Sequence, residues 1–160
     1  MKMYNTKYTD LKIIIKKSES WLVDSLYYVR ELNNSLIFQL PAGTRINVFS
    51  LKVKFTPDEP SNVIFRSNIN NLRPAFRFCI GGLKYVKSYL LFREEDFKSL
   101  YFEQPIPIIE IVDREKFSFE FERLAEGVVE IVMKVQITEP KKMSCNIFKK
   151  DDQYEQTRTL

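Results

Sequence analysis

The fold is decided by residues 117–138, which read FSFEFERLAEGVVEIVMKVQIT. Apolar residues occupy every second position in two runs, and a short loop that contains Gly127 separates the runs. Period-two alternation is typical of strands that bury one face and expose the other. Two such runs joined by a short loop predict a β-hairpin. We expect its buried face to carry the apolar positions of both runs: Phe117, Phe119, Phe121, Val129, Ile131, Met133, Val135 and Ile137.

Glu120 and Glu122 alternate with the phenylalanines and therefore fall on the exposed face. Two carboxylates on one surface are also the catalytic groups of glycosidases. Solvated charge on the outer face of a sheet is the more ordinary explanation, and we adopt it.

Residues 36–55 contain a second alternating stretch, which follows the turn signal Pro41-Ala42-Gly43. Ile46 and Val48 share one parity, whereas the apolar positions from Phe49 onward share the other. This switch predicts a β-bulge or bend near Val48 and Phe49, as occurs where strands pass from one sheet to another at a sandwich corner.

Other segments have weaker strand patterns. Residues 11–15 alternate, and residues 74–92 form two runs around a Gly81-Gly82 turn. We expect a shorter strand at residues 106–112, whose start Pro105 and Pro107 confine to an edge or a strand entrance. Two segments are ambiguous: residues 20–33 fit a helix capped by Ser20 or a pair of strands, and residues 93–101 fit one helical turn.

Roughly six to nine short strands with at most one short helix predict a mostly all-β fold, an antiparallel β-sandwich or jelly roll. A chain of 160 residues suits one domain with a core that needs no disulfide. We assign residues 1–139 to the sandwich and residues 140–160 to a polar C-terminal arm.

The residue inventory argues against an enzyme. The sequence contains no histidine, which excludes histidine-based nucleophilic pairs and histidine-ligated zinc. Cys79 and Cys145 have no partner spacing, so we expect inert thiols, and no glycine-rich phosphate loop is present. We therefore expect no catalytic residue, no cofactor and no metal. The sequence shows no signal peptide and no apolar run that would span a membrane, so we expect an intracellular origin without membrane contact.

Charge is distributed unevenly along the chain. Residues 66–93 hold six cations and no acid, whereas residues 94–130 hold eleven acids and four bases. Cations interleaved with aromatic residues occur in proteins that bind single-stranded nucleic acid, which makes such binding the alternative function. A simpler explanation is that alternating strands turn the aromatics inward and the cations outward. A third is self-association of complementary patches. The cations are Arg66, Arg73, Arg77, Lys84, Lys87 and Arg93.

Two stretches carry a resemblance. Residues 40–46, LPAGTRI, lead directly into a long alternating strand, and residues 105–138 contain a proline-led strand, FSFEF, a glycine turn and a long last strand. This pattern resembles small β-sandwich accessory proteins of tailed bacteriophages, of the head-decoration and head-fibre type. The resemblance implies a non-enzymatic structural subunit of a virion, assembled in the host cytoplasm as a homo-oligomer with other protein subunits. It assigns no residue a role.

The C-terminal arm has too little apolar surface to fold alone. Its few hydrophobic side chains are spaced as anchors along a polar segment, and we expect them to bind a neighbouring subunit: Ile147, Phe148, Tyr154 and Leu160.

Glycan binding by Trp21 and exposed tyrosines is a third hypothesis for the function, although a single tryptophan is more often part of a core.

Overall fold

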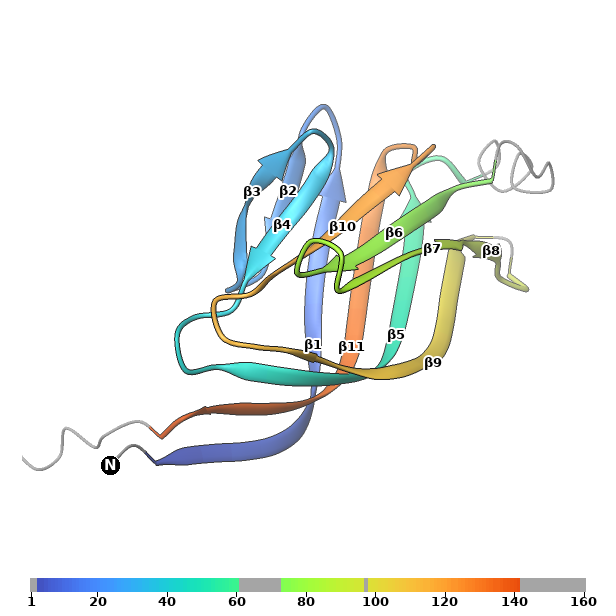
Figure 1. Ribbon diagram of the computed structural model, residues 1–160. Coiled ribbons are helices and arrows are strands. Elements are labelled where there is room, and N and C mark those ends of the chain that lie inside the picture. The colour runs from blue at the N-terminus through green and yellow to red at the C-terminus, as the bar shows by residue number, and fades with distance from the viewer. Residues whose placement is uncertain (1–2, 61–72, 97, 142–160) are drawn as a thin grey trace, which may run out of the picture.

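The computed structural model describes residues 3–60, 73–96 and 98–141, and folds them into eleven strands in two packed antiparallel sheets (Figure 1). The six-stranded sheet has the order β2 (Trp21–Asp24), β1 (Tyr4–Lys17), β11 (Gly127–Pro140), β5 (Arg45–Pro57), β9 (Leu100–Ile111) and β8 (Phe92–Arg93). The five-stranded sheet has the order β3 (Tyr28–Leu32), β4 (Ser35–Gln39), β10 (Lys116–Glu122), β6 (Ala75–Ile80) and β7 (Tyr85–Leu90).

The strand order is that of a jelly roll. The eight principal strands in chain order are β1, β4, β5, β6, β7, β9, β10 and β11. The first, eighth, third and sixth of these are adjacent in one sheet, and the second, seventh, fourth and fifth in the other. The extra strands β2 and β3 lie within the connection from β1 to β4 and extend one sheet each. The predicted fold class, an antiparallel sandwich or jelly roll, is confirmed.

The predicted hairpin at residues 117–138 is wrong in its pairing. β10 pairs with β4 and β6, whereas β11 pairs with β1 and β5, so the two runs lie in opposite sheets. The predicted burial is confirmed, because all eight apolar positions are buried. Alternation reports which face of a strand is buried but not which strand lies beside it. The loop at residues 123–126 therefore carries the chain across the core.

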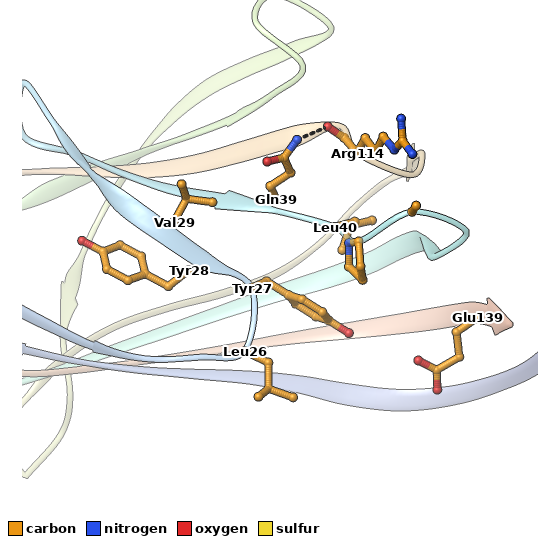
Figure 2. A pocket seen from close by; sticks show the side chains of 10 residues that line it. Leu26, Tyr27, Tyr28, Val29, Gln39, Leu40, Arg114 and Glu139 are labelled. Carbon is orange, nitrogen blue, oxygen red and sulfur yellow. Dashed lines mark hydrogen bonds between the residues drawn. The ribbon is translucent and has the colours of Figure 1, made fainter. Parts of the chain in front are cut away.

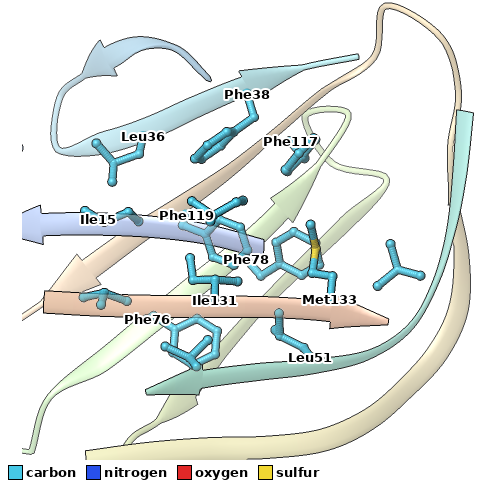
Figure 3. Packing of buried hydrophobic residues seen from close by; sticks show 14 of the residues in the cluster. Ile15, Leu36, Phe38, Leu51, Phe76, Phe78, Phe117, Phe119, Ile131 and Met133 are labelled. Atoms are coloured by element: carbon cyan, nitrogen blue, oxygen red, sulfur yellow. The ribbon is translucent and has the colours of Figure 1, made fainter. Parts of the chain in front are cut away.

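Aromatic side chains of the five-stranded sheet form the centre of that core (Figure 3). Phe119 stacks on Phe78 with ring centroids 4.8 Å apart, and Phe117 stacks on Phe38 at 5.2 Å. Aliphatic side chains of β1, β5 and β11 cover these rings from the other sheet. Such aromatic pairs contribute about 0.5–1.5 kcal/mol each beyond the area they bury.

The bulge predicted from the parity switch is confirmed at Phe49. Val48 pairs with Val135 and Ser50 pairs with Lys134, which leaves Phe49 as an extra residue opposite β11. The register with β9 also shifts between Val48 and Ser50. The expected passage to a second sheet does not occur, because β5 stays in the six-stranded sheet and bends sharply within it (Figure 1). A bulge bends and twists a strand without ending its pairing.

The ambiguous segments are strands. Residues 20–33 contain β2 and β3 and no helix. The described part of residues 93–101 contains the end of β8, a turn and the start of β9, so the helical turn expected there is wrong. The strand expected at residues 106–112 begins earlier, at Leu100. Its prolines lie where the two-residue β8 no longer covers β9, which is an edge position as predicted.

Candidate interaction surfaces

The long outer edge of β1 is open. β1 pairs with β11 along its whole length, from Tyr4 opposite Pro140 to Lys17 opposite Gly127. On the other side β2 pairs only with residues 14–17. In the described part of the chain, residues 4–13 therefore have no strand on this outer side. Such an edge presents backbone N–H and C=O groups that another strand can pair with.

The side chains of residues 4–10 on this edge are exposed on both faces. Ile13 and Ile15 are fully buried beneath the five-stranded sheet, but every residue from Tyr4 to Asp10 is exposed. Figure 1 shows the reason, because this half of β1 and its β11 partner run past the end of the sandwich together. The ribbon is held by β11 rather than by the core, and Lys141 N–H extends the contact by donating to the Met3 carbonyl at 2.7 Å.

A shallow groove of about 420 Å³ lies beside this edge. Tyr8 and Phe49 line it, with ring centroids 5.8 Å apart. Asp10 and Lys134 form an ion pair at 3.6 Å on its rim. Tyr8 is 74 % exposed, which leaves a large aromatic surface uncovered at the middle of the edge.

A second groove, of about 670 Å³, lies at the turns that connect the two sheets (Figure 2). It is lined by the β2–β3 turn, by Leu40, Pro41 and Ala42, and by Glu139 near the end of β11. Leu26 is 98 % exposed there. Burial, and secondarily the charge of Glu139, raise the pKa of the Tyr27 hydroxyl above its usual value. The groove is open, and its lining combines apolar side chains with the polar side chain of Gln39 and the charged side chains of Arg114 and Glu139.

The described residues include no group of three or more histidine, cysteine or acidic side chains that could hold a metal ion. Across the same residues, no helix is long and apolar enough to cross a membrane. No family model matches the chain, and no curated protein matches it.

Two of the predicted cations form ion pairs with the acidic segment of the same chain. Arg77 lies 3.6 Å from Glu120, and Lys84 lies 3.0 Å from Glu115. The two oppositely charged segments thus meet inside one molecule, in addition to any contact they make between copies.

The other cations are dispersed. Arg73 packs over the Phe92 ring at 4.8 Å, and Lys87 lies 5.5 Å from the ring centroid of Tyr89. Arg93 lies on β8 in the other sheet. Arg66 lies outside the described residues. Arg77 lies on β6, Lys87 on β7 and Lys84 in the turn between them, and Arg77 and Lys87 belong to opposite faces of the sheet. The cations that the structure describes therefore do not form one patch.

The aromatic residues of the basic stretch face the core. Phe76 and Phe78 are buried, and Tyr89 contacts Phe102 of the other sheet with centroids 4.4 Å apart. The hydroxyls of Tyr85 and Tyr89 share a hydrogen bond. Burial, with that hydrogen bond as the second cause, strongly raises the pKa of Tyr89. This arrangement matches the simpler explanation on β6, where Phe76 and Phe78 face inward and Arg77 faces outward. On β7 it does not, because Lys87 lies opposite the buried Phe78 and shares the face of Tyr85 and Tyr89.

The other residues considered as candidate sites are two glutamates, Trp21 and the anchors of the C-terminal arm. Glu120 and Glu122 lie on the outer face of the five-stranded sheet, as expected from the alternation. The Trp21 ring is partly buried, packs 5.7 Å from Phe121 and has the Lys17 ammonium 4.7 Å from its centroid. Four predicted anchors lie outside the described residues: Ile147, Phe148, Tyr154 and Leu160.

Neither Tyr8 nor Leu26 was predicted from the sequence. The signal for Tyr8 was present, because residues 4–10 lack the alternation of residues 11–15 and are polar at most positions. A strand that is polar on both faces has no core above it. Leu26 gave no comparable signal, since one leucine in a turn has no periodicity to interpret.

Proposed function

We propose that the chain is a non-enzymatic structural subunit of a virus-type particle, and that it acts by binding other protein subunits. The observation that carries this proposal is the open edge of β1 over residues 4–13. Soluble proteins usually shorten, cover or bend away their edge strands, because an open edge invites pairing with another chain. An uncovered edge with an exposed tyrosine at its middle is therefore a surface for assembly.

The fold agrees with this function without proving it. Jelly rolls serve as viral capsid domains and as lectins, among others, so fold alone selects no function. The lectin hypothesis receives little support, because Trp21 packs between Phe121 and Lys17 instead of offering a free ring. The sequence pattern resembles that of accessory proteins of tailed phages, which supports a virus particle as the assembly to which the chain belongs. The proposal includes assembly in the host cytoplasm and no cofactor.

Binding of single-stranded nucleic acid remains the alternative. Its support is the run of six cations without an acid in residues 66–93. Two of these cations are paired with Glu115 and Glu120, and the neighbouring rings face the core. Nucleic acid binding needs free cations beside exposed rings, so protein assembly is the function the geometry favours.

The test of the proposal is native mass spectrometry and electron microscopy of the full chain over a range of concentrations. We expect assemblies larger than a dimer. Lysines at Thr6 and Tyr8 on the β1 edge should prevent them, whereas lysines at Val86 and Ser88 on the β7 edge of the other sheet should not. A chain that stays monomeric or stops at a dimer under all conditions would overturn the proposal.

A further inference from the structure

We infer that two copies of this chain pair through the open edges of β1, antiparallel, with a two-fold axis at Tyr8. This inference rests on the proposed function, because it names the partner of the edge that the proposal uses. The result would be one continuous sheet formed from the six-stranded sheets of both copies.

Symmetry limits the registers that are allowed. A two-fold axis perpendicular to the sheet keeps the core-facing side of both copies on the same side. Residues that lie directly opposite each other in an antiparallel pair point to the same face. Each residue must therefore face one of its own parity, and the axis must pass through a residue position and not between two.

Charge and burial select among these registers. An axis at Lys7 would place two lysines opposite each other, and an axis at Asp10 would place two aspartates opposite each other. Like charges directly opposite each other destabilise a pair of strands. An axis at Thr9 would place Asn5 against Ile13, which is fully buried beneath the other sheet. An axis at Tyr8 pairs residues 4–12 of each copy and avoids all of these conflicts, whereas an axis at Thr6 would pair only residues 4–8.

With the axis at Tyr8, the side chains that the two copies bring together on the outer face of the sheet complement each other. Tyr8 would face Tyr8 of the second copy. Within each copy the Phe49 ring lies 5.8 Å from the Tyr8 ring, so four rings would gather at the axis. The 420 Å³ groove beside Tyr8 provides space for the partner's ring. Aromatic cross-strand pairs are among the stabilising contacts of sheets.

The flanking positions add polar matches. Thr6 faces the partner's Asp10, to whose carboxylate its hydroxyl can donate. Tyr4 faces the partner's Lys12, where an ammonium can lie over an aromatic ring. On the core side Lys7 faces Thr9, so none of the three charged residues of the edge meets a like charge.

Disulfide trapping tests this register. Both native cysteines are replaced by serine, and single cysteines are introduced at exposed edge positions. Tyr8→Cys should form a disulfide-linked dimer on mild oxidation, because opposite Cα atoms lie within the roughly 4.4–6.8 Å that a disulfide spans. Tyr4→Cys is the matched control, since eight residues separate the two copies of Tyr4 along the strand direction, about 27 Å, and should not cross-link.

A mixed experiment checks the same geometry away from the axis. Thr6→Cys mixed with Asp10→Cys should give a cross-linked heterodimer, while each variant alone should not cross-link. Sedimentation equilibrium provides a measurement without cysteines. Tyr8→Lys should weaken the dimer at least about tenfold, as expected for a central aromatic of an interface, whereas Tyr101→Lys, elsewhere in the same sheet, should not.

The outcomes separate this inference from the proposed function. Larger assemblies without a Tyr8→Cys cross-link, or with equal cross-linking at Tyr4→Cys, would overturn the inference and leave the function standing. A Tyr8-centred dimer that never assembles further would support the inference and remove the structural-subunit function. Absence of any dimer would overturn the inference.

Discussion

The rings of Tyr8 and Phe49 lie with their centroids 5.8 Å apart, although β11 separates the two strands that carry them. The contact exists because Phe49 is the extra residue of a bulge between Val48 and Ser50. A bulge re-aims a side chain, and here it turns a phenylalanine to the tyrosine at the middle of the open edge. The irregularity in β5 thus shapes the candidate interface.

Truncating a central ring should destabilise the fold strongly. Phe119 is fully buried and contacts Phe38, Phe76 and Phe78. Phe119→Ala should lower the free energy of unfolding by about 3–5 kcal/mol in urea titrations, because it leaves a cavity among these rings. Phe49→Ala is the matched control, and its cost should be smaller because this side chain is only partly buried and lies outside the core. Equal costs would contradict the described core.

Gly127 should resist substitution for a reason unrelated to turn geometry. A Cβ at this position would lie 2.4 Å from the Thr56 carbonyl oxygen and 2.7 Å from the Pro57 Cα. Gly127→Ala should therefore push β11 away from β5 and lower the melting temperature. At Gly82 an added Cβ would have no atom within 4 Å. Gly82→Ala should therefore lower the free energy of unfolding only by the cost of a left-handed backbone, about 1–2 kcal/mol. A smaller effect at Gly127 than at Gly82 would contradict the close strand approach.

Stability should fall in alkaline solution partly because of Tyr89. Burial and the Tyr85 hydroxyl raise the pKa of Tyr89 in the folded state above its unfolded value of about 10. The folded protein then holds this proton more tightly, so the associated stability is complete below about pH 10 and is lost as pH rises further. Urea unfolding between about pH 8 and pH 11 should show a shallower decline for Tyr89→Phe. An unchanged slope would show that Tyr89 does not contribute.

Removing the arm should separate folding from assembly. Truncation after Lys141 keeps the Lys141 N–H to Met3 carbonyl contact and all of β11. We expect the truncated chain to keep its melting temperature and its Tyr8-centred dimer, while losing larger assemblies, because the removed anchors include Ile147 and Phe148. Normal assembly of the truncated chain would show that the arm is not the contact.

Nucleic acid binding is tested by its salt dependence. We expect no measurable binding of single-stranded DNA or RNA in fluorescence anisotropy at low salt. Binding through the cations of residues 66–93 would instead weaken steeply with salt, with a slope near −0.7 per phosphate contact for a single strand. Such a slope, reduced by Lys87→Gln, would favour the alternative function.

Several features of the fold were predictable because they are local. The buried positions from Phe117 to Ile137 follow from alternation, and the bulge at Phe49 follows from a change of parity within one strand. The pairing of β10 with β11 was predicted wrongly for the same reason. β10 and β11 can bury their apolar faces either as a hairpin in one sheet or as strands of opposite sheets, so the local pattern does not distinguish these two arrangements.

The candidate interface shows the same division. The charges of the basic and acidic segments are properties of the chain, but the pairing of Arg77 with Glu120 and of Lys84 with Glu115 depends on which strands are neighbours. The polar residues 4–10 indicated a strand without a core above it, but the open side of β1 and the contact of Tyr8 with a phenylalanine two strands away depend on the tertiary structure.

The sequence by itself determined the buried face of the clearly alternating strands and the place where β5 bulges. These properties depend on side chains a few positions apart, whose apolar surface must leave water together. Only the tertiary structure decided the strand order, the ion pairs between segments and the length of β1 left without a partner. These depend on how eleven strands jointly bury one core, which no short window of sequence contains.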